Sequence, residues 1–171
     1  MNKQIVIING TGGCGKDTFV QFCEKYTKVL NFSSIDKVKE VARVIGWDGK
    51  KDEKDRKFLS DLKKLTTEYN DMAFNSTRQA VNNFLNSDCN LMFIHIREPE
   101  EIRRTKETFN CKTLLIKRVG YDNIESNYSD KNVNNYNYDY IIINDTLEQL
   151  ELSAKNFVDE LLNDLYLKKK V

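Results

Sequence analysis

The stretch QIVIINGTGGCGKDTFVQF, from Gln4 to Phe22, is the strongest indication of fold in this 171-residue chain. It begins with QIVIIN, a short run of β-branched and apolar residues that predicts a fully buried parallel strand. Four glycines follow within six residues, and the next segment, Asp17–Tyr26, places Phe19, Phe22 and Cys23 on one helical face. The sequence therefore predicts a strand, a glycine-rich turn and a helix in direct succession.

The turn itself, GTGGCGKDT from Gly10 to Thr18, nearly matches G-x-x-x-x-G-K-[ST], the pattern of a phosphate-binding loop. Asp17 follows Lys16, and the hydroxyl-bearing residue comes one place later, at Thr18. Glycines let several backbone N–H groups converge on one point, and the following helix directs its positive end there. Lys16 adds a mobile positive charge. We therefore expect a cradle for a polyphosphate rather than a tight turn with a surface lysine.

Two other nucleotide-binding motifs fit the chain less well. Gly10, Gly12 and Gly15 match G-x-G-x-x-G, but the second predicted strand ends in FSS, without the acidic residue that a dinucleotide site needs. The N-K-x-D base motif of GTPases is absent, since NKQI at Asn2 lacks the Asp. A GTPase-type switch protein is accordingly disfavoured.

Strands and helices alternate along the rest of the chain. Four further apolar runs predict strands: KVLNFSS (28–34), NLMFIHI (90–96), KTLLIKRV (112–119) and YDYIIIND (138–145). Between them we expect a helix after a Ser34 cap, one or two long helices over 56–88, a helix with Pro99 in its first turn, and a closing helix. This order predicts an α/β domain with a mainly parallel sheet and helices on both faces, and a single domain over 1–171.

Composition limits the partners. The net charge is +1, so no bulk basic field recruits a nucleic acid polymer or a membrane. No run approaches the roughly 20 apolar residues of a membrane span, and we expect a cytoplasmic protein. The four cysteines form no C-x-x-C pair, and with a single His no zinc-ligand spacing arises.

The GKDT form of the loop resembles the small P-loop kinases, among them adenylate kinase, and above all the phage-type deoxynucleoside monophosphate kinases and their bacterial relatives. The resemblance implies a three-layer α/β/α P-loop NTPase fold with a five-stranded sheet, and ATP and Mg²⁺ as cofactors. It also implies that Lys16 binds the β- and γ-phosphates and that Thr18 contacts phosphate and metal. Asp17 either orients Mg²⁺-bound water or complements the helix dipole.

The same resemblance extends to the end of the chain, where IIINDTLEQL is similar to the last strand and turn of dephospho-coenzyme A kinase and its relatives. It implies that Asn144, Asp145 and Thr146 lie near the adenine; a helix cap by Asp145 or Thr146 is the structural alternative. The full set of residues expected to bind ATP is Gly10, Gly12, Gly13, Cys14, Gly15, Lys16, Asp17, Thr18, Asn144 and Asp145.

Two further segments are similar to the acceptor and third-strand regions of these kinases. In FSSIDKVKEVA, Asp36 is the candidate acceptor-side carboxylate, either a base or a ligand to the substrate, and Lys37 or Lys39 the candidate for the acceptor phosphate. The alternative for Asp36 is an exposed residue in the first helical turn, favoured by the helix dipole. In FIHIREPEEI, Arg97 follows a central strand and is placed to grip a phosphate. His95 stands where an acidic residue is expected, so Glu98 or Asp36 would have to replace it, or His95 is a strand residue with a satisfied ring.

The segment KRVGYDNIESNYSDKNV resembles the lid of these kinases, and we expect a lid-like segment over about 118–138 that orders when ligands bind. Arg118 is its candidate for closing over the transferred phosphoryl group, although this lid is poor in arginine. A weaker hypothesis is that Trp47 and the cations after it shape the acceptor pocket.

The sequence thus favours an ATP-dependent kinase that phosphorylates a small acceptor, first of all a ribo- or deoxynucleoside monophosphate. A metabolite kinase similar to dephospho-coenzyme A kinase and a catalytically weak, ATP-binding regulatory protein are the alternatives. A homodimer stays open, although one apolar helical face is expected to be core rather than a dimer contact: Met72, Phe74, Ala80, Val81, Phe84 and Leu85.

Overall fold

The computed structural model describes residues 3–50, 52–120 and 132–167, with the side chains of residues 162–167 left aside. By the grouping of its contacts the chain divides into two compact units. The first unit comprises Met1–Asn31 and Ser87–Val171, and the second comprises Phe32–Asn86. The single domain expected over residues 1–171 stays a prediction.

A five-stranded parallel sheet underlies the fold and confirms the predicted fold class. Its strands are β1 (Gln4–Asn9), β2 (Val29–Ser33), β3 (Leu91–His95), β4 (Lys112–Arg118) and β5 (Tyr140–Asn144), in the order β2-β3-β1-β4-β5. β1 lies at the middle, where it pairs in parallel with β3 and with β4. Val6, Ile7 and Ile8 of β1 are fully buried, because this central strand is paired along both edges and helices cover both faces of the sheet. The loop after β1 therefore starts from a rigid point.

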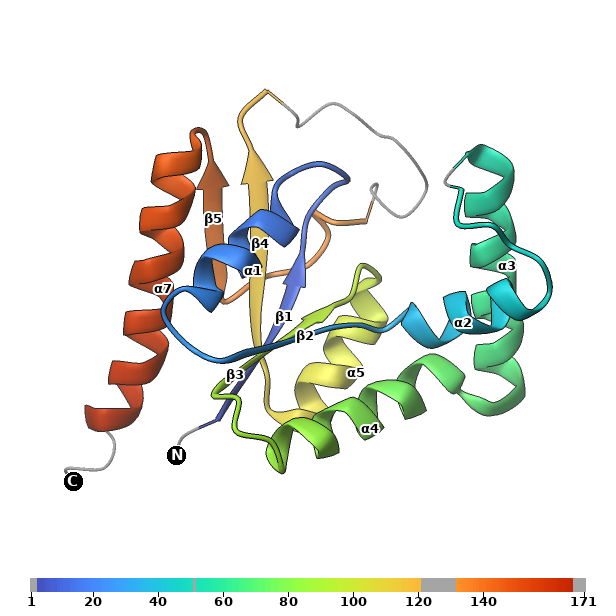
Figure 1. Cartoon of the computed structure of the whole chain (residues 1–171), viewed down its shortest axis with the longest axis horizontal. Coiled ribbons are helices and arrows are strands. Elements are labelled where there is room, and N and C mark those ends of the chain that lie inside the picture. The colour runs from blue at the N-terminus through green and yellow to red at the C-terminus, as the bar shows by residue number, and fades with distance from the viewer. Residues whose placement is uncertain (1–2, 51, 121–131, 168–171) are drawn as a thin grey trace. The chain divides into compact units, whose positions relative to one another are not determined.

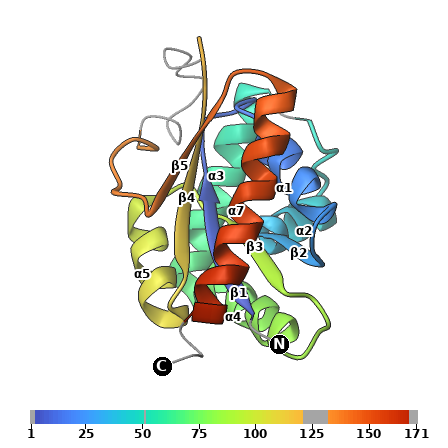
Figure 2. The same cartoon turned by 90° about the vertical axis from the view of Figure 1, so that its left-hand side faces the viewer.

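Three helices of the first unit cover the two faces of this sheet (Figure 2). Helices α1 (Lys16–Glu24) and α7 (Leu147–Leu167) pack against each other on one face, and α5 (Pro99–Phe109) contacts β1 and β4 on the other. Pro99 begins α5 as predicted, at a position where its missing N–H has no helical partner to lose. The unit is thus a three-layer α/β/α sandwich.

An aromatic cluster fills the layer between the sheet and the helix pair α1 and α7. The ring of Phe19 lies 5.7 Å from that of Phe157 and 6.2 Å from that of Phe93, both edge-on. Phe19 and Phe93 are fully inaccessible to solvent. Aromatic pairs of this geometry add about 1 kcal/mol each to the burial of their surface. The cluster holds the first helix against the sheet and so orients the loop that precedes it.

The second unit is helical, with α2 (Asp36–Val44), α3 (Glu53–Asn70) and α4 (Met72–Leu85). Asp71 separates α3 from α4, with a left-handed φ of 56°, so the long helical stretch predicted after residue 55 is two helices. Ile35 precedes α2 and provides no side-chain cap, and the Asp36 carboxylate accepts from the Ser33 N–H at 3.1 Å. The cap expected at Ser34 stays a prediction. Phe74, Val81 and Phe84 are buried, as expected of a core face, whereas Met72 and Ala80 are half-buried and Leu85 is 52% exposed, so the core prediction is wrong for Leu85.

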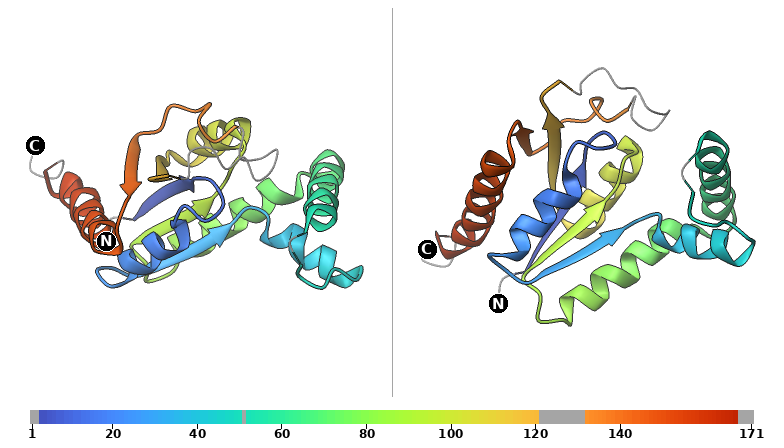
Figure 3. Two further views of the ribbon diagram at one scale, coloured as in Figure 1. Left: turned by 90° about the horizontal axis from the view of Figure 1, so that it is seen from above. Right: turned by 45° about the horizontal axis from the view of Figure 1, so that its top comes forward.

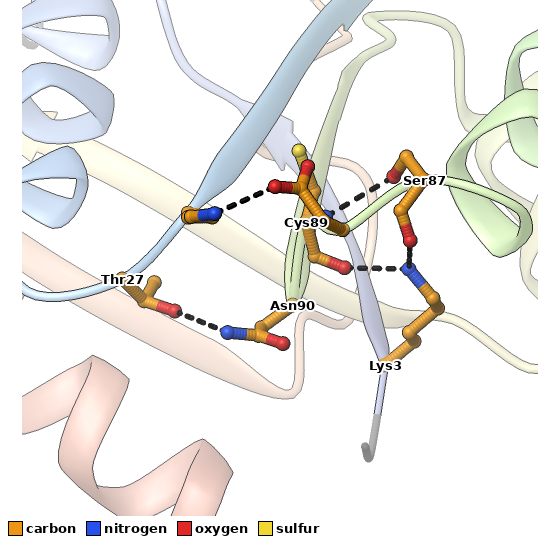
Figure 4. Close-up of polar contacts among 7 residues, drawn as sticks. Lys3, Thr27, Ser87, Cys89 and Asn90 are labelled. Atoms are coloured by element: carbon orange, nitrogen blue, oxygen red, sulfur yellow. Dashed lines mark hydrogen bonds and ion pairs between the residues drawn. The ribbon is translucent and has the colours of Figure 1, made fainter.

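The amino edge of the sheet, where the parallel strands begin, carries a polar cluster made of Lys3 and residues 27–28 and 87–90 (Figure 4). Lys3 Nζ donates to the carbonyls of Ser87 at 2.7 Å and Cys89 at 2.6 Å. An exposed ion pair joins Lys28 to Asp88 at 2.6 Å. These contacts tie the start of β1 to the turn before β3.

No helix within the described ranges is long and apolar enough to cross a membrane.

Candidate functional site

The glycine-rich loop, residues 10–15, lies at the carboxyl edge of the sheet between the end of β1 and the start of α1 (Figures 1 and 3). Gly15, the residue before α1, has a φ of 100°, in the left-handed region that favours glycine. A Cβ atom at this position would also collide with the side-chain amide of Asn144. The loop therefore has a conformation that requires glycine on both backbone and packing grounds.

The N-terminus of α1 opens onto this loop. Gly15 has no side chain, so the first helical turn has no capping hydrogen bond from that position. The N–H groups of a helix start and its dipole together attract anions. The acidic residue of that turn is Asp17, which is exposed, and Thr18 next to it is half-buried. The position of Asp17 suits an interaction with the helix dipole.

Lys16 lies folded against the loop. Its Nζ donates to the carbonyls of Gly10 at 2.6 Å and Thr11 at 2.9 Å, and lies 3.6 Å from the sulfur of Cys14. Burial lowers the pKa of Lys16; Cys14 acts in the opposite direction, while the positive charge of Arg97 lowers the pKa further. A cation held in partial desolvation beside another cation gains strongly from an anion placed between them.

Asn144 ends β5 and supports the loop from the side. Its Nδ2 donates to the Cys14 carbonyl at 2.9 Å, and the residue is buried. Asp145 after it is exposed, and the Thr146 hydroxyl accepts from the N–H of Gln149 at 3.2 Å. Thr146 thus makes the contact expected of a cap for α7, and the Asn144 amide is engaged with the loop backbone.

Two arginines join Lys16 in the first unit. Arg118 ends β4, and its Nη1 donates to the Gly13 carbonyl at 3.2 Å. Arg97 follows β3 by two residues and is half-buried, close enough to Lys16 to influence its pKa. Loops after adjacent parallel strands meet at one edge, which explains why residues distant in sequence come together. The structure therefore gathers three cations beside the glycine-rich loop.

His95 lies at the end of β3 and is half-buried. Its Nε2 is 2.8 Å from Oδ1 of Asn31 on the neighbouring strand. The ring therefore has a hydrogen-bond partner, as expected of a satisfied strand residue. β3, with the sequence LMFIH, contains no acidic residue, so His95 stands at the strand end where the resemblance leads us to expect one.

The predicted acceptor residues lie in the second unit. The Asp36 carboxylate accepts from Ser33 N–H and is 3.4 Å from Lys39 Nζ, while Lys37 pairs with Glu40 at 2.7 Å. Trp47 donates from its ring nitrogen to the Lys50 carbonyl at 3.1 Å. These are local contacts within one unit, and the acceptor role of Asp36, Lys37 and Lys39 stays a prediction.

Of the lid-like segment predicted over 118–138, residues 121–131 lie outside the described residues. Within the described ranges no group of three or more His, Cys, Asp or Glu side chains gathers as a metal site. Mg²⁺ at a phosphate-binding loop depends on few protein ligands and on phosphate oxygens. Asp17 and Thr18 lie in the first turn of α1, and their role at a metal ion stays a prediction.

Sequence reasoning overlooked Asn9 and Tyr138. Asn9 ends β1, is fully buried, and its Nδ2 donates to the hydroxyl of Tyr138 at 2.7 Å. The available signal was an amide at the end of an otherwise apolar strand, directly before the glycines. Its partner could not be inferred, since it lies 129 residues further along the chain.

No protein-family model matches the chain, and no curated protein matches it. Among solved structures the chain is similar to TT1252 from Thermus thermophilus, with a TM-score of 0.54 and 18% identity over 94% of this chain and 99% of that one. A thymidylate kinase from Ehrlichia chaffeensis also matches, with a TM-score of 0.42 and 10% identity over 93% and 99% of the two chains. At such identity the first similarity shows the fold, over nearly the whole of both chains.

Proposed function

We propose that this protein is an ATP-dependent phosphotransferase that moves the γ-phosphoryl group of ATP to a small acceptor, a ribo- or deoxynucleoside monophosphate. The observation that carries the proposal is the glycine-rich loop with Lys16 folded into it, at the open N-terminus of α1. The near-neutral net charge of +1 agrees with a small-molecule acceptor rather than a nucleic acid polymer. A cytoplasmic location is part of the same proposal.

In the proposed reaction the loop amides and Lys16 hold the β- and γ-phosphates. Lys16 Nζ now donates to two carbonyls, and it would exchange them for phosphate oxygens because a charged acceptor makes the stronger hydrogen bond. Arg97 and Arg118 would neutralise charge on the transferred group. Thr18, with Asp17 beside it, would hold Mg²⁺, and the ion would offset the negative charge of the phosphates.

The transfer needs little covalent chemistry from the protein. An oxygen of the acceptor phosphate forms a bond to the γ-phosphorus, the bond from that phosphorus to the β,γ-bridging oxygen breaks, and ADP leaves with the electron pair. A phosphate acceptor at neutral pH has an ionised oxygen, so no general base is required. Asp36, Lys37 and Lys39 are the candidates for orienting the acceptor.

One observation favours a second function, a catalytically weak ATP-binding regulatory protein. His95, paired with Asn31, occupies the strand end where the resemblance expects a carboxylate. A metabolite kinase similar to dephospho-coenzyme A kinase is the alternative within the kinase class, because the phosphate-binding loop alone does not select the acceptor.

The test is release of ADP from Mg·ATP against a panel of acceptors: each ribo- and deoxynucleoside monophosphate, dephospho-coenzyme A, and a blank without acceptor. Lys16→Ala protein runs in parallel. We expect turnover that depends on one class of monophosphate and that is lost in the variant. Equal turnover in the blank would indicate a plain ATPase. ATP binding with no turnover on any acceptor would support the regulatory function and overturn the proposed one.

A further inference from the structure

Asn9 is the last residue of β1, and its buried side-chain amide makes hydrogen bonds to three other residues. Its Oδ1 accepts from the Gly10 N–H at 2.8 Å. Its Nδ2 donates to the Arg97 carbonyl at 3.1 Å and to the Tyr138 hydroxyl at 2.7 Å. Both N–H donors and the carbonyl of the side chain are therefore used. One amide thus links the first residue of the glycine-rich loop, the chain after β3, and the chain before β5.

Tyr138, the hydrogen-bond partner of Asn9 before β5, is itself held in place by a second hydrogen bond. The side chain is 8% exposed, and its hydroxyl donates to the Val133 carbonyl at 2.9 Å while it accepts from Asn9. Burial raises the pKa of Tyr138 to about 12, while the hydrogen bond from Asn9 acts in the opposite direction. The phenol is therefore neutral at physiological pH and supplies both a donor and an acceptor.

The segment before β5 has a second, separate attachment one residue later. The Asp139 carboxylate accepts from Lys106 Nζ at 2.8 Å, from the Thr113 N–H at 2.8 Å, and from the Thr113 hydroxyl at 2.9 Å. Thr113 lies at the start of β4 and Lys106 in α5, so these bonds do not involve the glycine-rich loop. Two neighbouring residues thus attach the segment before β5 at two places. Tyr138 attaches it to the end of β1 next to the glycine-rich loop, and Asp139 attaches it to the start of β4.

We propose that Asn9 and Tyr138 form a positioning pair for the nucleotide site, an inference that rests on the proposed function. The hydrogen bond between them fixes the orientation of the Asn9 amide. That amide in turn holds the Gly10 N–H and the Arg97 backbone, and so sets where the loop and Arg97 meet a phosphate. Neither side chain contacts the phosphate itself; both act through Gly10 and Arg97.

The test compares Tyr138→Phe with Thr113→Val. Each variant removes one buried hydroxyl that anchors the same segment, and each replacement keeps the shape of the side chain. Hydrogen–deuterium exchange of the peptide covering residues 10–18 is measured in the nucleotide-free protein, and thermal melting shows how far each variant is destabilised. We expect several-fold faster exchange of this peptide in Tyr138→Phe and wild-type exchange in Thr113→Val at comparable stability.

Binding of Mg·ATP to the same proteins supplies the second readout. We expect about three- to tenfold weaker binding for Tyr138→Phe, the effect of one neutral hydrogen bond, and unchanged binding for Thr113→Val. Asn9→Asp, which keeps the acceptor for Gly10 but loses both donors, should weaken binding further. Equal exchange and equal binding in Tyr138→Phe and Thr113→Val would overturn the inference. A wild-type protein that binds no Mg·ATP would overturn the proposed function. The exchange measurement is made without nucleotide, so it tests separately whether Tyr138 holds the glycine-rich loop in place.

Discussion

Two lysines at opposite edges of the sheet make the same kind of contact and have different consequences. Lys3, at the amino edge, donates to two carbonyls that lie 84 and 86 residues away in sequence. Lys16, at the carboxyl edge, donates to two carbonyls only six and five residues before it. The first contact joins distant parts of the chain and stabilises the fold. The second stays within one glycine-rich loop and can be exchanged for a ligand without separating secondary-structure elements.

The charges that surround the two lysines also differ. Lys3 lies in a cluster with the exposed ion pair of Lys28 and Asp88. Lys16 lies beside another cation, Arg97, and burial lowers its pKa. A positive charge that is desolvated and close to a like charge favours an anionic partner, and a helix N-terminus next to it adds to that preference. The phosphate-binding role proposed for Lys16 therefore rests on the local charge balance and not on its hydrogen bonds alone.

The largest expected effect comes from removing each lysine in turn. Lys16→Ala should lower phosphoryl transfer by about 100-fold or more, because a charge aimed at the transferred group is lost. Lys3→Ala should leave transfer within about twofold of wild type and cost about 1–2 kcal/mol of unfolding free energy, since its charge-assisted hydrogen bonds are structural. ADP release and denaturant titration measure the two effects. Equal losses of activity in both variants would show that the two edges do not differ in the proposed way.

A glycine substitution extends the contrast between the lysines to the backbone of the loop. Gly15→Ala should cost about 2–3 kcal/mol, from about 1–2 kcal/mol of left-handed strain and about 1 kcal/mol for displacing Asn144 from the Cys14 carbonyl. Gly120→Ala is the matched control, because Gly120 also has a positive φ, of 76°, but beyond its chain neighbours no atom of the described residues lies within 4 Å of the place that a Cβ would take. Denaturant unfolding should show the smaller, strain-only loss for Gly120→Ala. An identical loss in both would mean that the packing of Asn144 on the loop contributes nothing.

Alkaline pH provides a smaller effect that again reports on the carboxyl edge. The pKa of Tyr138 is about 12 in the folded protein, above its ordinary value near 10. A raised folded-state pKa gives stability that is present below pH 10 and lost as the pH rises toward 12. Tyr138→Phe should lack this part of the pH dependence, so the difference in unfolding free energy between wild type and variant should shrink across that range. A difference that is constant from pH 9 to pH 12 would contradict the buried, hydrogen-bonded phenol.

Thiol chemistry gives the smallest effect. Burial raises the pKa of both Cys23 and Cys111 to about 12, so neither is a thiolate near neutral pH. Cys89, at the amino edge, is half-buried. In the native protein at pH 8 an alkylating reagent should modify Cys89 before Cys23 and Cys111, as mass spectrometry of digested samples will show. Faster labelling of Cys23 would mean that the helix α1 opens from the sheet more readily than its packing indicates.

The sequence predicted the parts of the structure whose determinants are local. The strand, loop and helix from Gln4 onward follow from β-branched residues, glycines and an apolar helical face that are contiguous in the chain. Five strands and their parallel arrangement follow from the alternation of buried runs with helices. The contact of Asn144 with the loop was not predicted, because the resemblance implied only that Asn144 lies near the adenine.

What the sequence did not predict depends on choices between near-equivalent alternatives or on distant partners. The helix break at Asp71 uses a left-handed non-glycine residue, which carries no distinctive sequence signal. The hydrogen bond from the Ser33 N–H to the Asp36 carboxylate was not predicted, because several side chains near the start of α2 could accept from the backbone. The Asn9–Tyr138 hydrogen bond spans 129 residues and depends on the folded arrangement of three segments.

A calorimetric titration with Mg·ATP tests most directly whether Lys16 belongs to a phosphate-binding site. Wild type, Lys16→Ala and Lys3→Ala are compared at one salt concentration. We expect one ATP bound per wild-type chain, equal affinity for Lys3→Ala, and affinity lower by a factor of about 10 or more for Lys16→Ala, the loss of a charged hydrogen bond to phosphate. Wild-type affinity in Lys16→Ala, or no binding to any of the three proteins, would contradict the proposed site.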